Sequence, residues 1–264
     1  MLEYREFSAP EGSPLQCVWE LRGEASEQQR IPPDGRCELI VHLQQPFEAL
    51  SPAGWKRQSA TLIAGQMTSP LLVRAAGSTH SVGVRFKSWA SAYLGNRPAS
   101  ELTNQIAEGT EVNPGLAVEF WDIANRFPSD LEKLAGHIMM KFAATWTADL
   151  RVTACVHMIE QRSGQCRIEE LATLTGLSFK QLERLFHQHV GVGPKTLARI
   201  RRFSHVFAQL EALQGNWAQI AYECGYTDQS HLARDFAQFT GVPPAALLSA
   251  NSDLAWCFTA AHEE

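Results

Sequence analysis

A short stretch near the end of the chain places hydrogen-bonding side chains on one side of a helical pattern and apolar side chains on the other. In "GYTDQSHLARDF" (225–236), Gln229, Ser230 and Arg234 are interspersed with Leu232 and Phe236, which are four residues apart. Because side chains three or four residues apart share a helix face, the apolar pair would face a core. Arg can bond guanine bidentately and Gln suits adenine, so the polar face carries groups that read DNA bases. An ordinary solvated helix is the alternative.

The same arrangement occurs fifty residues earlier in the chain. "LERLFHQHVGVGPKTL" (182–197) aligns with "LARDFAQFTGVPPAAL" (232–247), with matching Leu, Arg, Phe, Gln, Gly, Val and Pro positions. Upstream of each stretch, a further helical pattern ends at Gly176 or Gly225, and glycine permits the positive φ of a turn. The repeat predicts two helix-turn-helix units, at about 167–191 and 216–241. For either unit alone, a helix pair that never meets DNA is the alternative.

The segment between the two units predicts a long helix that sets their separation. "PKTLARIRRFSHVFAQLEAL" (194–213) would span roughly 30 Å, and one turn of B-DNA is about 34 Å. Two recognition helices at that separation reach successive major grooves. Lys195, Arg199 and Arg201 in its first half are candidates for phosphate contacts, with a solvated face as the alternative. Ser178 and either Thr227 or Asp228 are expected to cap the recognition helices, and exposed helix amides also meet phosphate.

The region 150–248 resembles the DNA-binding domain of the AraC (AraC/XylS) family of bacterial transcription regulators. The resemblance depends on "LSFKQLERLFHQHVGVGPKTLARIRR" and "IAYECGYTDQSHLARDFAQFTGVPP". Leu197 departs from the family's usual aromatic residue, and the ending "AALLSA" lacks its usual Tyr-Arg. The resemblance implies double-stranded DNA as a partner, and RNA polymerase if the protein is an activator. By position, it implies base contacts from Lys180, Glu183, Arg184, Gln229, Ser230 and Arg234.

Residues 1–110 carry the pattern of a β-rich domain. "CELIVHL", "ATLIAGQM", "LLVRAA" and "SVGVRF" are short apolar or β-branched runs separated by Pro and Gly turn signals. Their spacing predicts a sandwich or small barrel. The region is similar to a class of regulator domains related to a reduced cupin-like barrel, in which an effector binds or two copies dimerise. The chain as a whole is expected to be α+β with two domains.

The β-rich domain has residues that could line an effector pocket, although buried tryptophans more often form core. The candidates are Trp19, Glu38, His42, Trp55, Phe86 and Trp89. His42 and His80 suggest a cupin metal site, but without a His-x-His pair or placed acids we expect no metal and no cofactor. With no nucleophile elbow or phosphate loop, we expect no enzyme. A cupin-type metalloenzyme fused to a DNA-binding domain is the alternative, and a domain used only for assembly is a third reading.

Residues 111–148 predict linker or dimerisation helices. In "SDLEKLAGHIMMKFAATW", Ser129 and Glu132 form a capping box ahead of an apolar stripe made by Leu131, Leu134, Ile138 and Phe142. Packing into the chain's own core is one reading of this stripe, and a homodimer interface is the other.

Composition fits a protein without membrane association. No apolar run is long enough to span a bilayer, and the start "MLEYREFSAP" does not read as a secretory signal. Six scattered cysteines without a CxxC pair predict reduced thiols in a cytoplasmic protein. The net charge is −5, with a small basic excess in 149–250, the predicted DNA-binding domain, and an acidic tail at 251–264. A basic segment favours a polyanionic partner only weakly.

Overall fold

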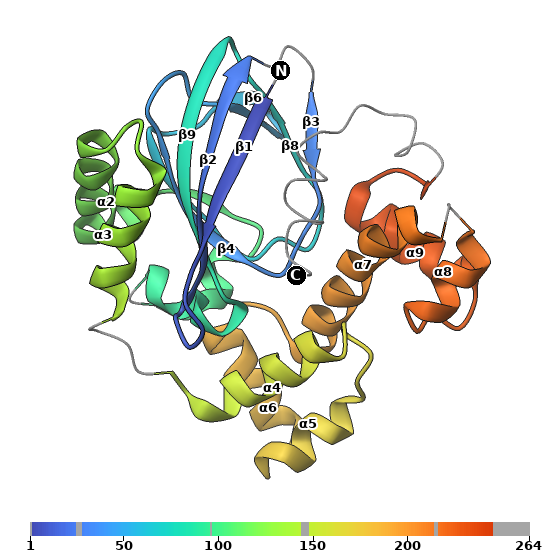
Figure 1. The fold of residues 1–264 in the computed structure, drawn as a ribbon. Coiled ribbons are helices and arrows are strands. Elements are labelled where there is room, and N and C mark those ends of the chain that lie inside the picture. Colours follow the sequence, from blue (N-terminus) through green and yellow to red (C-terminus); the bar gives the residue numbers. More distant parts are fainter. Residues whose placement is uncertain (1, 25–27, 96, 144–147, 214–215, 245–264) are drawn as a thin grey trace.

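The computed structural model describes residues 2–24, 28–95, 97–143, 148–213 and 216–244. Within these ranges a β-rich N-terminal domain lies beside a helical C-terminal domain (Figure 1). This α+β arrangement in two domains confirms the predicted fold class. The predicted acidic tail at 251–264, the end "AALLSA" and Cys257 lie outside the described residues. In the part that is described, no helix is long and apolar enough to cross a membrane.

Two antiparallel sheets build the N-terminal domain. The first has the order β1-β2-β9-β4-β7-β10 and the second the order β3-β8-β5-β6. The strands are β1 (Leu2–Ser8), β2 (Leu15–Glu24), β3 (Gln29–Ile31), β4 (Cys37–His42), β5 (Glu48–Ser51), β6 (Gly54–Arg57), β7 (Thr61–Ala64), β8 (Leu71–Arg74), β9 (Ser78–Phe86) and β10 (Ile106–Glu108). The prediction found β4, β7, β8 and β9 but missed β1 and β2, in which charged residues interrupt the apolar ones, and the short strands β3, β5, β6 and β10.

Side-chain alternation gives the larger sheet two different faces. Its inner face meets the second sheet around a small apolar cluster that includes Trp19, Leu21 and Val73. Its outer face belongs to the largest core cluster, with Val18, Leu39 and other fully buried residues. The two faces therefore serve different purposes, and the inner one leads to a cavity.

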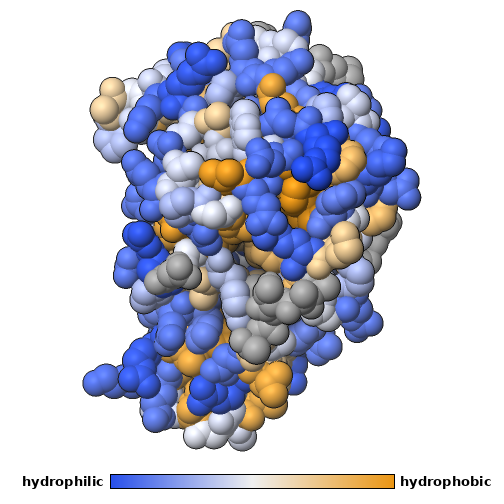
Figure 2. Space-filling model, turned by 90° about the vertical axis from the view of Figure 1, so that its left-hand side faces the viewer, coloured by the Kyte–Doolittle hydropathy of each residue, from blue (hydrophilic) through white to orange (hydrophobic). Residues whose placement is uncertain are grey.

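Two helices cover the outer face of the larger sheet: α2 (Pro114–Arg126) and α3 (Leu131–Ala143), after the single-turn α1 (Gly109–Val112). Leu134 and Ile138 are each 1% exposed, so the apolar stripe of α3 packs into the chain's own core. The predicted capping box at Ser129 is wrong, because Asp130 Oδ1 accepts from Lys133 N at 3.1 Å. Viewed from the α2–α3 side, the surface shows hydrophobic patches separated by hydrophilic residues (Figure 2).

Among the described residues, six helices build the C-terminal domain as two copies of a three-helix unit. They are α4 (Leu150–Gln161), α5 (Ile168–Thr175), α6 (Phe179–His189), α7 (Pro194–Ala212), α8 (Trp217–Glu223) and α9 (Gln229–Thr240). Within each copy, the first helix contacts the two that follow, so α7 has in the second copy the place that α4 has in the first. The fifty-residue repeat in the sequence is this structural repeat.

The two copies differ in the core to which they belong. The first copy shares one continuous apolar cluster with the N-terminal domain, because α4 and α6 pack on the 3-10 helices Ser88–Leu94 and Ala99–Leu102. The second copy has a separate cluster around Phe203, Phe207 and Phe236. The first copy is therefore part of the N-terminal body, whereas the second is joined to it through α7 and a few polar contacts.

Candidate nucleic-acid interface and ligand cavity

The turn of the first unit exposes the start of its second helix. Gly176 ends α5 with φ +67°, the left-handed conformation predicted for the turn. Ser178 then caps α6: its Oγ accepts from Gln181 N at 3.4 Å, and Gln181 Oε1 accepts from Ser178 N at 3.0 Å. This reciprocal capping box fixes the direction in which α6 begins.

Helix α6 separates its apolar and polar residues as the sequence predicts. Leu182 and Phe186 are fully buried, while Lys180, Glu183 and Arg184 are exposed in the first two turns. Glu183 lies within 3.5 Å of His187 Nε2, one turn further along. The three predicted base-contact residues of the first unit therefore share an open surface.

The second unit repeats this geometry with one change in its cap. Gly225 has φ +69° at the turn, and Asp228 Oδ1 accepts from His231 N at 2.7 Å. The cap is therefore Asp228, and the assignment of Thr227 as the cap is wrong. Thr227 Oγ1 instead lies 2.9 Å from His231 Nδ1, and the His231 ring also packs edge-on against Tyr226.

The second set of predicted base contacts also lies together on an exposed surface. Gln229, Ser230 and Arg234 are exposed at the start of α9, and Leu232 and Phe236 are buried. Arg234 Nε donates to Ser230 O at 3.2 Å, which holds the guanidinium group near the first turn of the helix. The surface offers the guanidinium of Arg234, the side-chain amide of Gln229 and the hydroxyl of Ser230 within two helical turns.

The predicted phosphate contacts on α7 differ in their environments. Lys195 is exposed. Arg199 Nη2 donates to Asp235 Oδ1 at 2.6 Å, which ties α7 to α9. Arg201 is only 8% exposed, and its Nη1 donates to the backbone oxygen of Asp34 at 3.1 Å. Phosphate contact remains a prediction for all three, but two of the cations already have protein partners.

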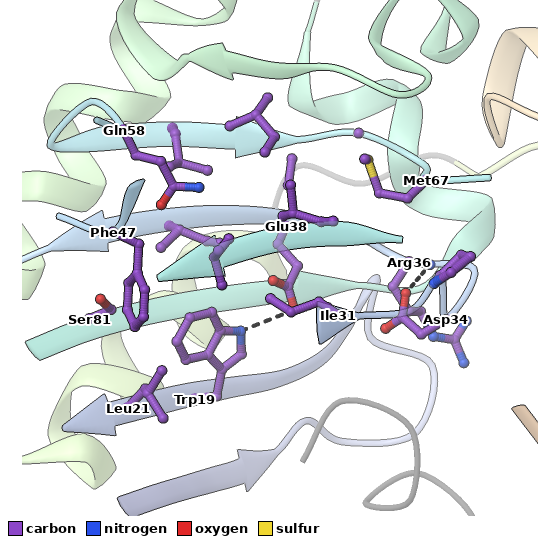
Figure 3. A pocket seen from close by; sticks show the side chains of 18 of the residues that line it. Trp19, Leu21, Ile31, Asp34, Arg36, Glu38, Phe47, Gln58, Met67 and Ser81 are labelled. Atoms are coloured by element: carbon purple, nitrogen blue, oxygen red, sulfur yellow. Dashed lines mark hydrogen bonds between the residues drawn. The ribbon is translucent and has the colours of Figure 1, made fainter. Parts of the chain in front are cut away.

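A cavity opens between the two sheets of the N-terminal domain (Figure 3). Its volume is about 90 Å³, which is enough for several water molecules. Trp19, Glu38 and His42 line it, as predicted. The other polar residues in the wall are Asp34, Arg36, Gln58 and Ser81. Apolar residues contribute most of the rest: Leu21, Ile31, Pro32, Pro33, Ile40, Phe47, Leu62, Ala64, Met67, Leu71, Val73 and Ile106.

Three of the six predicted pocket residues lie elsewhere. Phe86 and Trp89 belong to the core on the opposite side of the larger sheet, because Phe86 has the outward parity along β9. Trp55 lies on β6, where the Arg74 guanidinium stacks over its ring at 4.5 Å. Sequence reasoning also missed Ser81 and Gln58. Ser81 pairs with His42 in the sheet register and so shares its face, but Gln58 follows β6 and gives no periodic signal.

The charged and polar groups of the cavity are bonded to one another. Glu38 Oε1 accepts from Arg85 Nε at 2.6 Å and from Trp19 Nε1 at 3.2 Å. Burial raises the pKa of the Glu38 carboxyl, against the opposing effect of the Arg85 guanidinium. A Cβ at Gly83 would overlap the indole of Trp19, so the glycine admits that ring across β9.

At the other end of the cavity, His42 bonds to two neutral groups. His42 Nδ1 lies 2.7 Å from Ser81 Oγ, and His42 Nε2 lies 3.0 Å from Gln58 Oε1. Because an amide oxygen only accepts, Nε2 carries the proton and Nδ1 accepts from Ser81. Burial lowers the pKa of His42 to about 4, so the imidazole is neutral near pH 7.

The geometry does not bring His42 and His80 together. His80 Nε2 bonds to Glu20 Oε1 at 2.9 Å on the outer face of the sheet, whereas His42 faces the cavity. Among the residues that the structure describes, no group of three or more His, Cys, Asp or Glu side chains could hold a metal ion. The two histidines on which a cupin-type metal site would depend therefore lie on opposite faces. Cys17, Cys37, Cys155, Cys166 and Cys224 are free thiols.

Two family models match separate parts of the chain. Residues 171–250 match a family described as a helix-turn-helix domain, and residues 13–108 match a domain of unknown function (DUF6597). The C-terminal region is thus a tandem helix-turn-helix domain. This match agrees with the resemblance of the region to AraC-type DNA-binding domains.

A curated relative and two solved structures are also similar to this chain. An uncharacterized HTH-type transcriptional regulator of Haemophilus influenzae is 31% identical over 94 residues, which cover 35% of this chain and 31% of the relative. The crystal structure of ToxT from Vibrio cholerae is 12% identical with a TM-score of 0.47, covering 94% of this chain and 96% of ToxT. ToxT bound to (E)-4-(8-methylnaphthalen-1-yl)but-3-enoic acid is 13% identical with a TM-score of 0.48, covering 94% and 98%. With TM-scores below 0.5, the structural similarity is limited.

Proposed function

We propose that this protein is a sequence-specific DNA-binding regulator of transcription that inserts α6 and α9 into successive major grooves. The observation that carries the proposal is the tandem repeat itself, with two glycine turns and two exposed polar helix starts. Helix α7, with 19 residues, spans about 28 Å, close to the roughly 34 Å between successive grooves on one face of B-DNA. Lys180, Glu183 and Arg184 would read one half of the site, and Gln229, Ser230 and Arg234 the other.

Phosphate contacts would position the two helices without reading sequence. The exposed Lys195 suits this role, as do the backbone amides at the capped starts of α6 and α9. Arg199 and Arg201 would join only if they exchanged their protein partners for phosphate. RNA polymerase is a further partner if the protein activates transcription, and a homodimer would double the recognition surface. The proposal includes no catalytic activity.

The N-terminal domain is proposed to make DNA binding depend on a small-molecule effector. The cavity between the sheets supports this role, because it is mostly apolar with a few convergent polar groups, the usual character of a ligand site. A domain that serves only for assembly is the competing reading. A thermal-shift screen against metabolites separates the two, since a ligand that binds only the native state raises the melting temperature.

Selection of bound sites from random double-stranded DNA tests the DNA-binding proposal directly. The expected outcome is enrichment of a motif with two recognised segments about one helical turn apart. Recovery of sequences with no common motif, at an affinity equal to that for random DNA, would contradict it.

A further inference from the structure

The loop Pro32–Arg36 lies between the cavity and the helices of the C-terminal domain. Pro32, Pro33, Asp34 and Arg36 line the cavity. Gly35, with φ +79°, packs on α7 instead, and a Cβ at this position would lie 3.0 Å from Leu197 Cδ1. A single loop of five residues therefore contacts both a ligand-sized space and the helix that joins the two DNA-binding units.

Polar contacts fasten this loop to two different helices. Arg36 forms an ion pair with Glu160 near the end of α4, and its Nη1 donates to Ser88 Oγ at 2.8 Å. Arg201 of α7 donates to Asp34 O at 3.1 Å. Arg36 and Arg201 are 6% and 8% exposed. Breaking the Arg36–Glu160 pair would leave a buried charge uncompensated, and breaking the Arg201 contact would leave the Asp34 carbonyl without this donor. A movement of the loop would therefore disturb its contacts with both α4 and α7.

The chemistry of the cavity restricts what could occupy it. Its wall is mostly aliphatic and aromatic, and each charged group beside it lies within 4 Å of an opposite charge, with Glu38 and Asp34 sharing Arg85. Glu38 pairs with Arg85 at 2.6 Å, Asp34 lies 3.7 Å from Arg85, and Arg36 pairs with Glu160. A ligand with a formal charge would lose its hydration without gaining a counter-charge, which is unfavourable.

The His42 end of the cavity supplies hydrogen bonds without charge. Since the Gln58 carbonyl accepts from His42, the Gln58 amide N–H groups are the donors that this end can offer. A ligand with an acceptor oxygen and an apolar body would match both the wall and this end. Space for several waters in the cavity suits a molecule of about one ring.

We propose that the cavity binds a small, uncharged, largely apolar molecule with one hydrogen-bond acceptor, and that the loop Pro32–Arg36 transmits its binding to α4 and α7. The transmission step rests on the proposed function, because its readout is DNA affinity. A ligand that touches Pro32 and Pro33 favours one loop conformation, and the conformation that it favours determines the positions of both helices. The ligand shifts DNA affinity only to the extent that it binds the two loop conformations unequally.

The ligand class is tested with three probes of similar size on the full chain: benzyl alcohol, benzoate and benzylamine. In isothermal titration calorimetry at millimolar concentration, benzyl alcohol should bind, and the two charged probes should bind at least about tenfold more weakly. Ala64→Phe fills the cavity and should abolish binding, and Leu71→Phe is a second, milder filling variant if the first fails to fold. Preference for a charged probe, no binding of any probe, or binding that survives a folded filling variant would overturn the assignment.

The transmission step is tested by DNA affinity with and without benzyl alcohol, using a site selected from random DNA. The wild type should change its Kd by about fivefold or more, the lower range of allosteric coupling. Glu160→Gln, which neutralises the partner of Arg36, and Gly35→Ala, which strains the loop against α7, should keep probe binding but lose most of this change. Glu101→Gln breaks only the exposed pair with Arg97 and should behave as wild type.

The possible outcomes distinguish a failure of the transmission step from a failure of the proposed DNA-binding function. A protein that binds benzyl alcohol but no DNA sequence would overturn the proposed function and with it the transmission step. A protein that binds its DNA site and benzyl alcohol independently, with unchanged Kd, would overturn transmission alone. Equal coupling in Glu160→Gln, Gly35→Ala and the wild type would show that a different element carries it.

Discussion

Arg30 on β3 donates from Nη1 to the backbone oxygen of Thr240, the last residue of α9, at 2.8 Å. The two residues are 210 positions apart in the chain, and the bond joins the sheet beside the cavity to the second helix-turn-helix unit. Helix C-termini have unpaired carbonyls, so a cation there satisfies one of them. Gly241 follows Thr240, and a Cβ there would lie 2.8 Å from Arg30 Nη1, so the missing side chain makes room for the contact.

Removing the contact between Arg30 and Thr240 should lower the local stability of the second helix-turn-helix unit but not that of the first. Arg30→Ala is expected to speed amide hydrogen exchange in α8 and α9 about fivefold, equivalent to about 1 kcal/mol. Exchange in α4–α6 should stay unchanged, because these helices share the core of the N-terminal domain. Mass spectrometry of the exchanged chain measures both regions together. Equal acceleration in both units would mean that they open as one.

If the two recognition helices contact bases, removing one contact should lower DNA affinity and relax base preference at a single position of the site. Arg184→Ala and Arg234→Ala should each cost about 1–3 kcal/mol of binding to the preferred site and relax the choice of base at one position. Binding to a series of single-base variants of the site measures this. Arg126→Ala, an exposed arginine on α2, serves as the control and should change nothing. Uniform weakening across all sequences would identify these arginines as phosphate contacts.

Packing in the second unit predicts a large effect of one aromatic residue. Phe236 is fully buried among Phe203, Phe207 and Trp217. Phe236→Ala should lower the free energy of unfolding by about 3–5 kcal/mol, because it removes apolar contacts and leaves a cavity. Tyr222, which is 80% exposed, provides the control, since Tyr222→Ala should stay within about 0.5 kcal/mol. Urea titration gives both values, and similar losses would refute the assigned core.

The cap assignment predicts unequal effects of two neighbouring residues. Asp228→Ala should cost about 1 kcal/mol of stability, because it frees the amide of His231 at the start of α9. Thr227→Ala should cost less, since Thr227 bonds the His231 side chain and no helix amide. Thermal melts of the two variants and the wild type decide between them. A larger loss from Thr227→Ala would restore threonine as the cap.

His42 predicts a dependence of stability on pH. Its pKa is about 4 in the folded protein, below the ordinary 6.5, so the unfolded chain takes up a proton more readily. The wild type should therefore lose stability as pH falls from about 6.5 towards 4, by about 3 kcal/mol in total. His42→Gln should lack this part of the loss, whereas the exposed His157→Gln should follow the wild type. Denaturant titrations at several pH values measure the difference, and parallel curves for wild type and His42→Gln would contradict the assignment.

The helical half of the molecule is the part that the sequence predicts best. Its order is local, because glycines at 176 and 225 and apolar spacings of three and four residues define each helix and turn. The β-rich half depends on pairings between distant segments, such as Ser81 with His42, which no short pattern reveals. Glu38 and His42 were found through alternation along a single strand. Gln58 and the loop Pro32–Arg36 enter the cavity only through the packing of the two sheets.

The contact between the two domains was also beyond sequence reasoning. Arg201 looks like a free cation in a basic helix, yet its partner is the carbonyl of Asp34, 167 residues away. Nothing in the spacing of charges distinguishes it from Lys195, which is exposed. Phe86 was assigned to the wrong side of the sheet for a related reason, since a strand's inward and outward faces become known only when its partners are known. Trp89 lies on the 3-10 helix Ser88–Leu94, where alternation along a strand no longer applies.

The apolar cluster that runs from the outer face of the larger sheet into α4 and α6 has an evolutionary consequence. Thr103 Oγ1 donates to Gly191 O at 2.7 Å along the same junction, so an apolar cluster and a hydrogen bond both join the two parts. Genetic recombination near residue 148 would expose this face on both daughter proteins. The N-terminal domain and the first helix-turn-helix unit are therefore expected to be inherited as a single piece, and new combinations should arise by substitution within the chain.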